Sequence, residues 1–385
     1  MFELLNSRKF RNIASQVITL LVVVLFLSYI TNNVFNNIEQ RGITTGFGFF
    51  NQNASFGIAE SAIEYNDTTS TYFTAFLVGL INTLIVSFAG IFFASIIGLI
   101  VGIARLSKNY IIAKLSGFYI ELFRNIPILL QILFWYNVVL AALPSPKQSI
   151  SLAGDIFLNN RGFYIPRPIF ESGFLFVLIA IILSIVLIYF INRFANKKFD
   201  NTGKETPVLL IGFAIIIILP LLTYFISGSP LSFEIPALKG FNYVGGLNYS
   251  PEFLALTFAL SIYTATYIAE AIRSGIEAVA KGQKEAAKSL GLSPYKSLKI
   301  VILPQAIRIA IPPIINQYLN LVKNSSLATA IGYPELFTVF AGTALTQTGQ
   351  AIEIIFITML VYLFISLSIS LVLNIVNKKL KVKGR

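Results

Sequence analysis

Long apolar stretches alternate with short polar ones along the chain, and eight of the apolar stretches have the length of a membrane-spanning helix. They lie near residues 17–35, 74–103, 119–143, 172–192, 207–227, 252–272, 305–330 and 351–376. A helix needs about 20 apolar residues to cross the hydrocarbon layer of a bilayer. The pattern therefore predicts an all-α integral membrane protein with about eight transmembrane helices.

The first apolar stretch begins like a signal peptide but does not end like one. It follows Arg8, Lys9 and Arg11, and it ends in Thr31-Asn32-Asn33 without a small-residue cleavage site. Its apolar run is also too long for a cleaved signal. We interpret it as a retained signal anchor, so that residues 1–73 hold a cytoplasmic segment, this anchor helix and the first periplasmic loop.

The positive charges predict the orientation in the membrane. Of the 29 Lys and Arg residues, 22 lie in the N-terminal segment, in residues 104–118, 193–206 and 273–308, and in the tail. The loops on the opposite side hold only Arg41, Lys147, Arg161, Arg167 and Lys239. Because cytoplasmic loops carry the excess of Lys and Arg, both termini should be cytoplasmic, including a basic tail at 377–385. We assign no strands to the external loops near 36–73, 144–171, 228–251 and 332–350.

Composition excludes several classes of function. The 385 residues are 56% hydrophobic and only 12% charged, with no Cys and no His. Without Cys or His the chain has no disulfide, no thiolate or imidazole metal site, no Cys nucleophile and no His-based triad. The net charge of +12 is mostly an orientation signal, so we expect membrane lipid and no nucleic acid as a partner. We predict no catalytic residue and no metal site.

The cytoplasmic loop 273–304 carries the most specific local pattern. Apolar residues such as Ile276, Val279 and Ala287 recur at helical spacing and oppose lysines, which predicts a short amphipathic helix. Gly291 suits a left-handed C-terminal cap, and Ser293-Pro294 suits the start of a second helix. The pattern thus predicts helix, glycine turn, helix. On pattern alone, the first helix could instead lie on anionic lipid.

The same loop resembles the E-A-A…G…I-x-L-P loop of permease subunits in bacterial ABC importers. It reads Glu285-Ala286-Ala287, then Gly291, then Val301-Ile302-Leu303-Pro304, with Val301 where that family usually has Ile. The resemblance implies a type-1 permease domain at 74–376. It also implies docking on a separate ATPase through Glu285, Ala286, Ala287, Gly291, Leu303 and Pro304. Small Ala side chains permit close approach, and a carboxylate accepts charge-assisted hydrogen bonds from a basic partner.

Other segments narrow the resemblance. Residues 79–88 and 121–136 resemble the polar amino-acid permease family, and residues 102–109 and 159–168 are similar to its general L-amino-acid branch. This implies import of L-amino acids across the bacterial inner membrane. The implied partners are a second permease subunit, with a sister chain favoured, two ATPase subunits and a periplasmic amino-acid-binding protein. The chain lacks a G-x-x-x-x-G-K-[ST] loop, so we expect it to bind no cofactor and the partner ATPase to bind ATP and Mg²⁺.

Polar residues inside the predicted spans are candidates for the substrate path because they are costly in lipid. In the seventh span Asn316, Asn320 and Lys323 share one helical face, flanked by Gln317 and Asn324. Amides and a Lys could bind a zwitterionic amino acid, or they could hold helices of two subunits together.

Two further spans contribute polar residues. Arg124 and Gln131 of the third span are also candidates, although Arg124 could form a structural ion pair with Glu121. Tyr263, Thr264, Thr266 and Tyr267 of the sixth span could complete the lining, whereas Glu270 suits a solvated or loop-pairing charge.

Two other classes of function compete with a pump subunit. A secondary transporter or channel driven by an ion gradient usually has matching interrupted helices in two halves, and the sequence has no such internal symmetry. A membrane enzyme would need paired carboxylates or a nucleophile with its base. The acids near the inner ends of the spans, Glu121 and Glu270, each have basic neighbours instead of a second acid.

Overall fold

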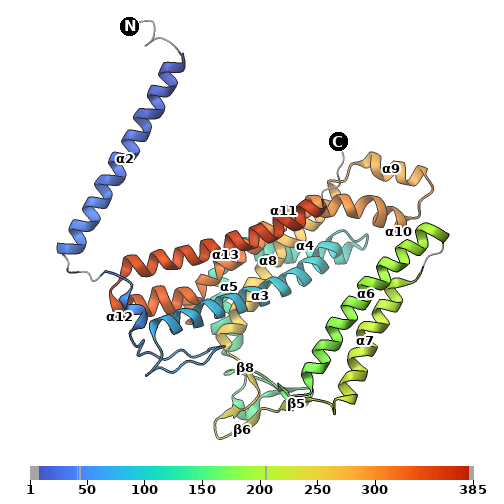
Figure 1. Cartoon of the computed structure of the whole chain (residues 1–385), viewed down its shortest axis with the longest axis horizontal. Helices are drawn as coiled ribbons and strands as arrows, with labels where there is room; N and C mark the ends of the chain where they lie inside the picture. The colour runs from blue at the N-terminus through green and yellow to red at the C-terminus, as the bar shows by residue number, and fades with distance from the viewer. Residues whose placement is uncertain (1–7, 41, 43–44, 204–205, 381–385) are drawn as a thin grey trace. The chain divides into compact units, whose positions relative to one another are not determined.

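The computed structural model describes residues 8–40, 42, 45–203 and 206–380. The chain divides into two compact units (Figure 1). The first comprises Met1–Leu133 and Leu256–Arg385, and the second comprises Phe134–Ala255. The predicted segments 1–7 and 381–385 lie outside the described residues.

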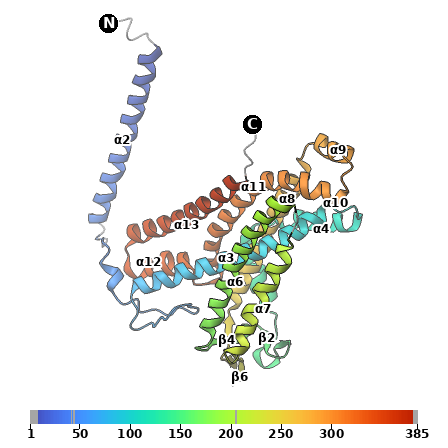
Figure 2. The same cartoon turned by 45° about the vertical axis from the view of Figure 1, so that its right-hand side comes forward.

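The first unit consists of helices and helical turns. Its elements are α2 (Arg8–Gln40), η1 (Gly48–Asn51), α3 (Tyr72–Arg105), α4 (Tyr110–Asn125), α5 (Ile128–Phe134), α8 (Pro251–Glu277), α9 (Lys281–Ser289), α10 (Pro294–Lys296), η4 (Ser297–Ile302), α11 (Leu303–Asn324), η5 (Ser325–Ile331), η6 (Phe337–Ala344), α12 (Leu345–Thr348) and α13 (Ala351–Leu380). The last residue of α5, Phe134, and residues 251–255 of α8 belong to the second unit. Figures 1 and 2 show α11 and α13 running side by side.

The helical membrane class predicted from the sequence is confirmed. Among the described residues, seven helices are long and apolar enough to cross a membrane. A bent pair, Tyr110–Asn125 with Ile128–Leu140, would supply an eighth span. The last candidate span, Ala351–Ile375, agrees with the predicted 351–376, while the helix α13 itself continues to Leu380 and so includes the start of the predicted tail.

The third span is broken, which corrects the single helix predicted over 119–143. α4 ends at Asn125, and the pair is bent by 101° at the break. Pro127 explains the break, because a proline lacks an N–H and disfavours helical geometry in the residue before it. Ile126 indeed has the extended angles φ −95° and ψ 127°.

A seam of small residues brings α3 against α8. Gly90, Ala94, Gly98 and Gly102 recur every fourth position of α3, and all four are buried. A Cβ on Gly98 would lie 2.7 Å from the Ile268 side chain, and one on Gly102 would lie 2.9 Å from a backbone oxygen of α8. Small residues at such spacing let two membrane helices pack at backbone distance.

The segment after α11, where the sequence predicts an external loop at 332–350, folds back against α3. Its turn is fixed by Asn82, whose Nδ2 donates to the carbonyl oxygens of Glu60 and Pro334 at 2.8 and 2.9 Å. Thr83 Oγ1 accepts from the backbone N–H of Leu336 at 3.0 Å. Beyond this turn, η6 and α12 are helical. The segment does lie between two candidate spans, as predicted, but its helical form depends on contacts with residues about 250 positions away, which the local sequence does not reveal.

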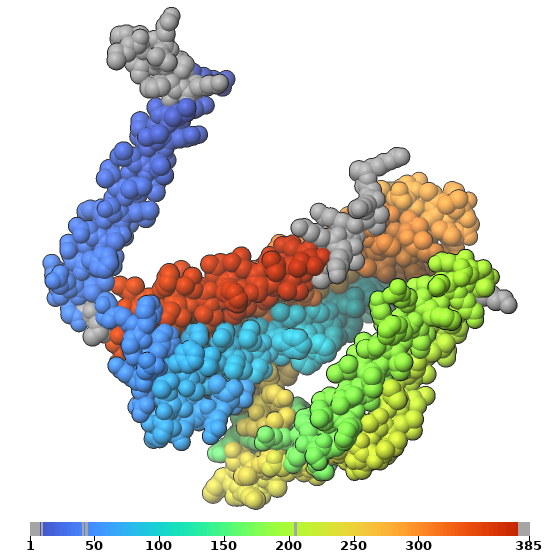
Figure 3. Space-filling model, viewed as in Figure 1, coloured from blue at the N-terminus to red at the C-terminus, as the bar shows by residue number. Residues whose placement is uncertain are grey.

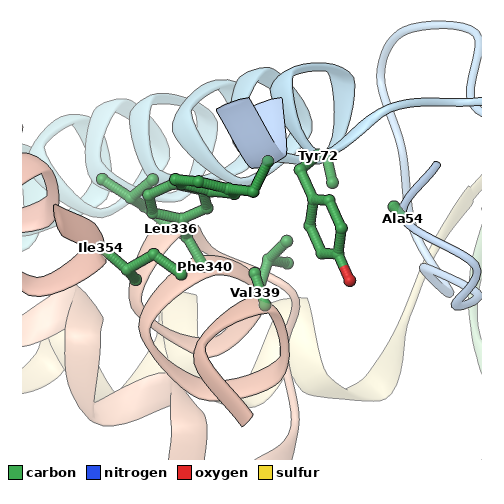
Figure 4. Packing of buried hydrophobic residues seen from close by; sticks show 9 residues of the cluster. Ala54, Tyr72, Leu336, Val339, Phe340 and Ile354 are labelled. Carbon is green, nitrogen blue, oxygen red and sulfur yellow. The ribbon is translucent and has the colours of Figure 1, made fainter. Parts of the chain in front are cut away.

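An aromatic and aliphatic cluster covers this turn. Phe49 of η1, Tyr72 of α3, and Leu336 and Phe340 around η6 are buried together with Ile354 of α13 (Figure 4). The rings of Phe49 and Phe50 stack with centroids 4.6 Å apart. Burial of these side chains anchors the 45–71 segment on the helices.

The second unit combines a helical hairpin with short strands. Its helical elements are η2 (Trp135–Leu140), η3 (Pro146–Gln148), α6 (Phe174–Thr202) and α7 (Val208–Ile226), and its strands are β1 (Ile150–Leu152), β2 (Ile156–Asn159), β3 (Gly162–Ile165), β4 (Arg167–Phe170), β5 (Leu231–Glu234), β6 (Ala237–Lys239), β7 (Asn242–Val244) and β8 (Leu247–Tyr249). The antiparallel sheet has the order β1-β2-β3-β8, while β4-β5 and β6-β7 form separate pairs. These strands correct the expectation of strand-free external loops, because pairings such as β3 with β8 join distant segments and cannot be read from loop composition.

Glu335 is a buried acid that links η6 to α13 in the first unit. It is 0% exposed and accepts hydrogen bonds from the N–H groups of Phe337 and Thr338 at 2.9 and 2.7 Å. The hydroxyls of Thr338 and Tyr362 also donate to it, at 2.9 and 2.6 Å. Burial raises the pKa of Glu335, and these donors oppose that rise. The side chain therefore caps η6 and joins it to α13.

Replacing Glu335 with Ala should lower the thermal stability of the purified chain strongly, because two backbone donors and two hydroxyls lose their shared acceptor. We expect a loss of about 3 kcal/mol, compared with about 1 kcal/mol for Tyr362→Phe, which removes one donor. Melting temperatures in detergent should fall in the order wild type, Tyr362→Phe, Glu335→Ala. The control Glu64→Ala, which changes an exposed acid, should melt like wild type. Equal melting of Glu335→Ala and this control would contradict the capping role.

Candidate functional site

The predicted helix, glycine turn and helix of the 273–304 loop are present. α9 spans Lys281–Ser289, and Gly291 follows it with φ +72°. The N–H of Leu292 donates to the carbonyl of Ala287 at 3.2 Å, and that of Gly291 donates to Lys288 at 3.0 Å. This is the Schellman arrangement of a helix C-terminus, and its left-handed residue favours glycine.

The second helix begins as its residue types predict. Ser293 is extended at φ −61° and ψ 155°, and its hydroxyl accepts from the N–H of Lys296 at 3.4 Å. Pro294 occupies the first helical position, where its missing N–H does no harm. The helix then continues through η4 into α11, which starts with Leu303 and Pro304.

The proposed coupling residues lie at the surface of this loop. Figure 3 shows the orange α9–α10 segment exposed. Glu285, Ala286 and Pro304 are exposed, whereas Ala287 is buried. Leu290 and Tyr295 flank the turn and are 79% and 70% exposed. The turn thus presents Glu285 together with exposed apolar side chains on one segment of the loop.

Side-chain hydrogen bonds tie α9 to the helices before and after it. Lys284 Nζ donates to the carbonyl of Ile276 on α8 at 3.4 Å. Gln305 Nε2, on α11, lies 3.5 Å from Gln283 Oε1 of α9. α9 also packs against η4. α9 is therefore in contact with both α8 and α11.

Glu270 pairs with the loop, one of the two roles foreseen for it. Arg273 Nε donates to Glu270 Oε2 at 3.1 Å, and the same guanidinium also pairs with Glu277. These two contacts are the ion pairs among the described residues. They stiffen the last turns of α8, directly before α9.

The polar face of α11 is formed as the spacing predicts. Asn316, Asn320 and Lys323 are exposed, and Gln317 and Asn324 are partly buried. Neither proline of the Pro312-Pro313 pair ends the helix. Three exposed polar side chains on one face of a spanning helix need water or another protein surface opposite them.

Arg124 does not pair with Glu121, contrary to the alternative considered for it. Its guanidinium lies 5.2 Å from the ring centroid of Tyr267 on α8, within cation–π distance. The Tyr267 hydroxyl in turn lies 3.0 Å from that of Tyr263. Arg124 and the two tyrosines therefore form one contiguous polar group between α4 and α8.

Gln131 has a different environment from the other candidates. It is 4% exposed, and its Nε2 donates to the carbonyls of Phe123 and Ile126, both at 2.9 Å. These carbonyls lie at the break that Pro127 causes in the span. Gln131 thus satisfies backbone groups of the broken helix, and its amide nitrogen is engaged there.

Lys323 also lies at a cavity that the sequence did not indicate. This cavity has a volume of about 410 Å³ and is lined mainly by apolar residues of η6 and α13, including Phe337, Met359 and Leu363. Periodicity could not reveal it, because it depends on how α13 packs beside α11.

The described residues contain no group of three or more Asp and Glu that could hold a metal ion.

Comparison with known proteins supplies the context for these features. Residues 190–382 match the family model described as "Binding-protein-dependent transport system inner membrane component". The protein assigned in Escherichia coli K12 as the amino-acid ABC transporter permease YhdX is 50% identical over 96% of this chain and 94% of its own length.

Two further relatives match almost end to end. The general L-amino acid transport system permease protein AapQ of Rhizobium johnstonii is 47% identical, over 98% of this chain and 94% of AapQ. The glutamate/glutamine/aspartate/asparagine transport system permease protein BztB of Rhodobacter capsulatus is 36% identical, over 99% of this chain and 96% of BztB.

Proposed function

The chain belongs to the family of binding-protein-dependent transport system inner membrane components, and we propose that it is the permease subunit through which an ABC importer moves L-amino acids across the bacterial inner membrane. The observation that carries this proposal is the identity of 47–50% over nearly the whole chain to relatives named as amino-acid permeases. It favours an importer subunit over a transporter or channel driven by an ion gradient.

The partners follow from this membership. A binding protein delivers the amino acid on the outer side, and two separate ATPase subunits bind ATP and Mg²⁺ and hydrolyse the nucleotide on the inner side. A second permease subunit completes the path, and the similarity to a general L-amino-acid system favours a sister chain. Both termini and the 273–304 loop lie in the cytoplasm in this arrangement. This agrees with the positions of the Lys and Arg residues, since 22 of the 29 would lie on the cytoplasmic side.

Coupling between ATP hydrolysis and transport runs through α9. The ATPase binds Glu285 and the exposed apolar residues beside it. When the ATPase closes on ATP, it therefore moves α9. The hydrogen bonds from Lys284 to α8 and between Gln305 and Gln283 pass this motion to two spanning helices. Gly291 fixes the angle between α9 and the helix that leads into α11.

The polar face of α11 and the Arg124 group border the substrate path in this proposal. Asn320, Asn316 and Lys323 supply amide and ammonium groups, and Arg124 with Tyr263 and Tyr267 supplies further donors. A zwitterion that leaves water needs both donors and acceptors along its route. Gln131 supports the bend beside this path through its Nε2.

In proteoliposomes that contain both permeases and the ATPases, amino-acid uptake should require ATP and the binding protein. Uptake should persist when the proton gradient is collapsed and ATP is maintained, because the driving force is hydrolysis. Radiolabelled L-amino acid inside the vesicles gives the measurement. Uptake that stops with the gradient while ATP remains would contradict the proposal.

Glu285→Ala should weaken attachment of the ATPase by about ten- to hundredfold, because a lost charge-assisted contact contributes about 1.5–3 kcal/mol. Gly291→Val should leave the subunits associated but poorly coupled, because a β-carbon at positive φ costs about 1 kcal/mol and tilts the two helices. No atom lies within 4 Å of a Cβ at Gly291, so the effect arises from the backbone. Co-purification of ATPase and amino-acid uptake should be measured side by side.

Matched controls separate the two effects. Asp200→Ala changes an exposed acid of α6, and Gly282→Ala changes a glycine of α9 that lacks positive φ and has open space around it. Both controls should behave like wild type. If Glu285→Ala and Gly291→Val do so as well, the loop is only a helix on the lipid surface.

Replacing Asn320 or Lys323 with Ala should reduce uptake while complex assembly and basal ATP hydrolysis persist, because the substrate loses polar partners. Ser368→Ala on α13, a polar change at an exposed position, should leave uptake unchanged. Purification yield of the complex and uptake are the two measurements. Dissociation of the complex would assign the face to contact between subunits, and unchanged uptake would contradict both roles.

A further inference from the structure

The second unit contains a polar cavity that neither the coupling loop nor the α11 face involves. Its volume is about 550 Å³. Its lining includes Tyr136 of η2, Arg161 of the β2–β3 turn, Asn242 of β7, Asn248 of β8 and Glu252 at the start of α8. The cavity thus gathers residues from across the unit, and in the proposed orientation it lies on the outer side of the membrane.

Two opposite charges line this cavity without pairing with each other. Arg161 and Glu252 are absent from the ion pairs of the described residues. Glu252 Oε1 accepts from the Tyr136 hydroxyl at 2.8 Å, and its place in the first turn of α8 favours a carboxylate. The Arg161 side chain is exposed and makes no hydrogen bond within the described part of the chain. Each charge therefore retains capacity to bind a ligand.

Hydrogen bonds and close packing hold the backbone around Arg161 in place. The backbone N–H of Arg161 donates to Asn159 Oδ1 at 2.8 Å, and Asn159 is 1% exposed. Gly162 has φ +138°, and a Cβ there would lie 2.4 Å from the carbonyl oxygen of Tyr249. Tyr164, 1% exposed, donates its hydroxyl to Asn242 Oδ1 at 2.9 Å. Burial raises the pKa of Tyr164 from its already high ordinary value, and the hydrogen bond to Asn242 opposes that rise.

The arrangement suits the part that all α-amino acids share. A guanidinium binds a carboxylate in a bidentate fashion, and a carboxylate binds an ammonium. The volume lies in the range of small-molecule sites, about 300–1,000 Å³. The apolar part of the lining comes from Ala141, Pro251 and the rings of Tyr136 and Tyr164, and the lining residues include no long aliphatic side chain that would mark a pocket for one particular apolar group.

We propose that this cavity is an external binding site for free α-amino acids, in which Arg161 binds the carboxylate and Glu252 binds the ammonium. The proposal rests on the proposed amino-acid transport and adds to it a site outside the spanning helices. The site recognises the zwitterion and tolerates different side chains. It gives an amino acid released by the binding protein a place to bind before it enters the path.

A local labelling experiment tests the site directly, because the chain has no natural cysteine. Asn248→Cys places a thiol at the cavity, and Ser151→Cys places one on exposed β1 outside it. The full chain in nanodiscs is treated with a maleimide, with or without saturating L-alanine or L-leucine. Both amino acids should slow labelling of Asn248→Cys by at least about threefold, as expected for an occupied site, and should leave Ser151→Cys unchanged.

Analogues and second substitutions identify the two charges. L-alaninamide lacks the carboxylate and N-acetyl-L-alanine lacks the ammonium, so neither should protect the thiol. When Arg161→Gln or Glu252→Gln is added to Asn248→Cys, the amino-acid concentration needed for half-maximal protection should rise about tenfold. Arg167→Gln and Glu234→Gln change exposed charges of β4 and β5 outside the cavity and should keep protection.

The outcomes separate this inference from the proposed function. Absence of protection in the Asn248→Cys chain, or full protection in the Arg161→Gln and Glu252→Gln backgrounds, would overturn the site even if ATP-driven uptake persists. Protection with the expected charge dependence supports the site. If protection is present but the complete wild-type complex imports no amino acid, the proposed function is wrong and the binding site stands.

Discussion

The close approach of α3 to α8 is the constraint on which the first unit depends. Lipid tails are as apolar as leucine, so membrane helices associate through packing and polar contacts and not through exclusion of water. Gly98 and Gly102 remove the side chains that would keep the two helices apart, because a Cβ at Gly98 would lie 2.7 Å from Ile268 and one at Gly102 would lie 2.9 Å from the carbonyl oxygen of Ala269. The Ser261 hydroxyl, 3.4 Å from the carbonyl of Gly90, reflects the same short distance. α8 is thereby held against α3, and it carries the Tyr263–Tyr267 pair and leads directly into α9.

Breaks in the helices are the second physical problem, because every backbone polar group in a membrane needs a partner. At Pro127 the chain bends by 101°, and the buried Gln131 amide donates to the carbonyls of Phe123 and Ile126. After α11 the chain turns back, and Asn82, Thr83 and Glu335 pair with the backbone of the turn and of η6. In both places a buried polar side chain performs the task that water performs in a soluble loop. Such residues resemble functional groups in a sequence, although their role is to stabilise the fold.

The same unit supports the division of labour in a transport system. The sequence has no phosphate-binding loop, and in the proposed function the 273–304 loop offers a short helix with Glu285 and exposed apolar residues to a partner. The Schellman turn at Gly291 makes the angle between α9 and the next helix a fixed property of the chain. The Arg273 contacts with Glu270 and Glu277 stiffen the end of α8. A helix tied on both sides can transmit force, whereas a flexible loop would absorb it.

The sequence by itself determined the features that depend on neighbouring residues. Apolar runs predicted seven of the spans. Gly291 and Ser293-Pro294 predicted the geometry of the 273–304 loop. The spacing of Asn316, Asn320 and Lys323 predicted the exposed polar face of α11. Proline chemistry could also have predicted the break at Pro127. The small residues at every fourth position of α3 are a further signal in the sequence, and a search for long apolar runs does not detect it. The tertiary structure alone decided what distant residues make together. It turned 332–350 into helices against α3, built strands in 144–171 and 228–251, and gathered Arg161 and Glu252 at one cavity. The physical reason is range: helix periodicity and caps act within a few positions, whereas Glu335, Asn82 and the cavity residues acquire their roles from partners that only folding brings near.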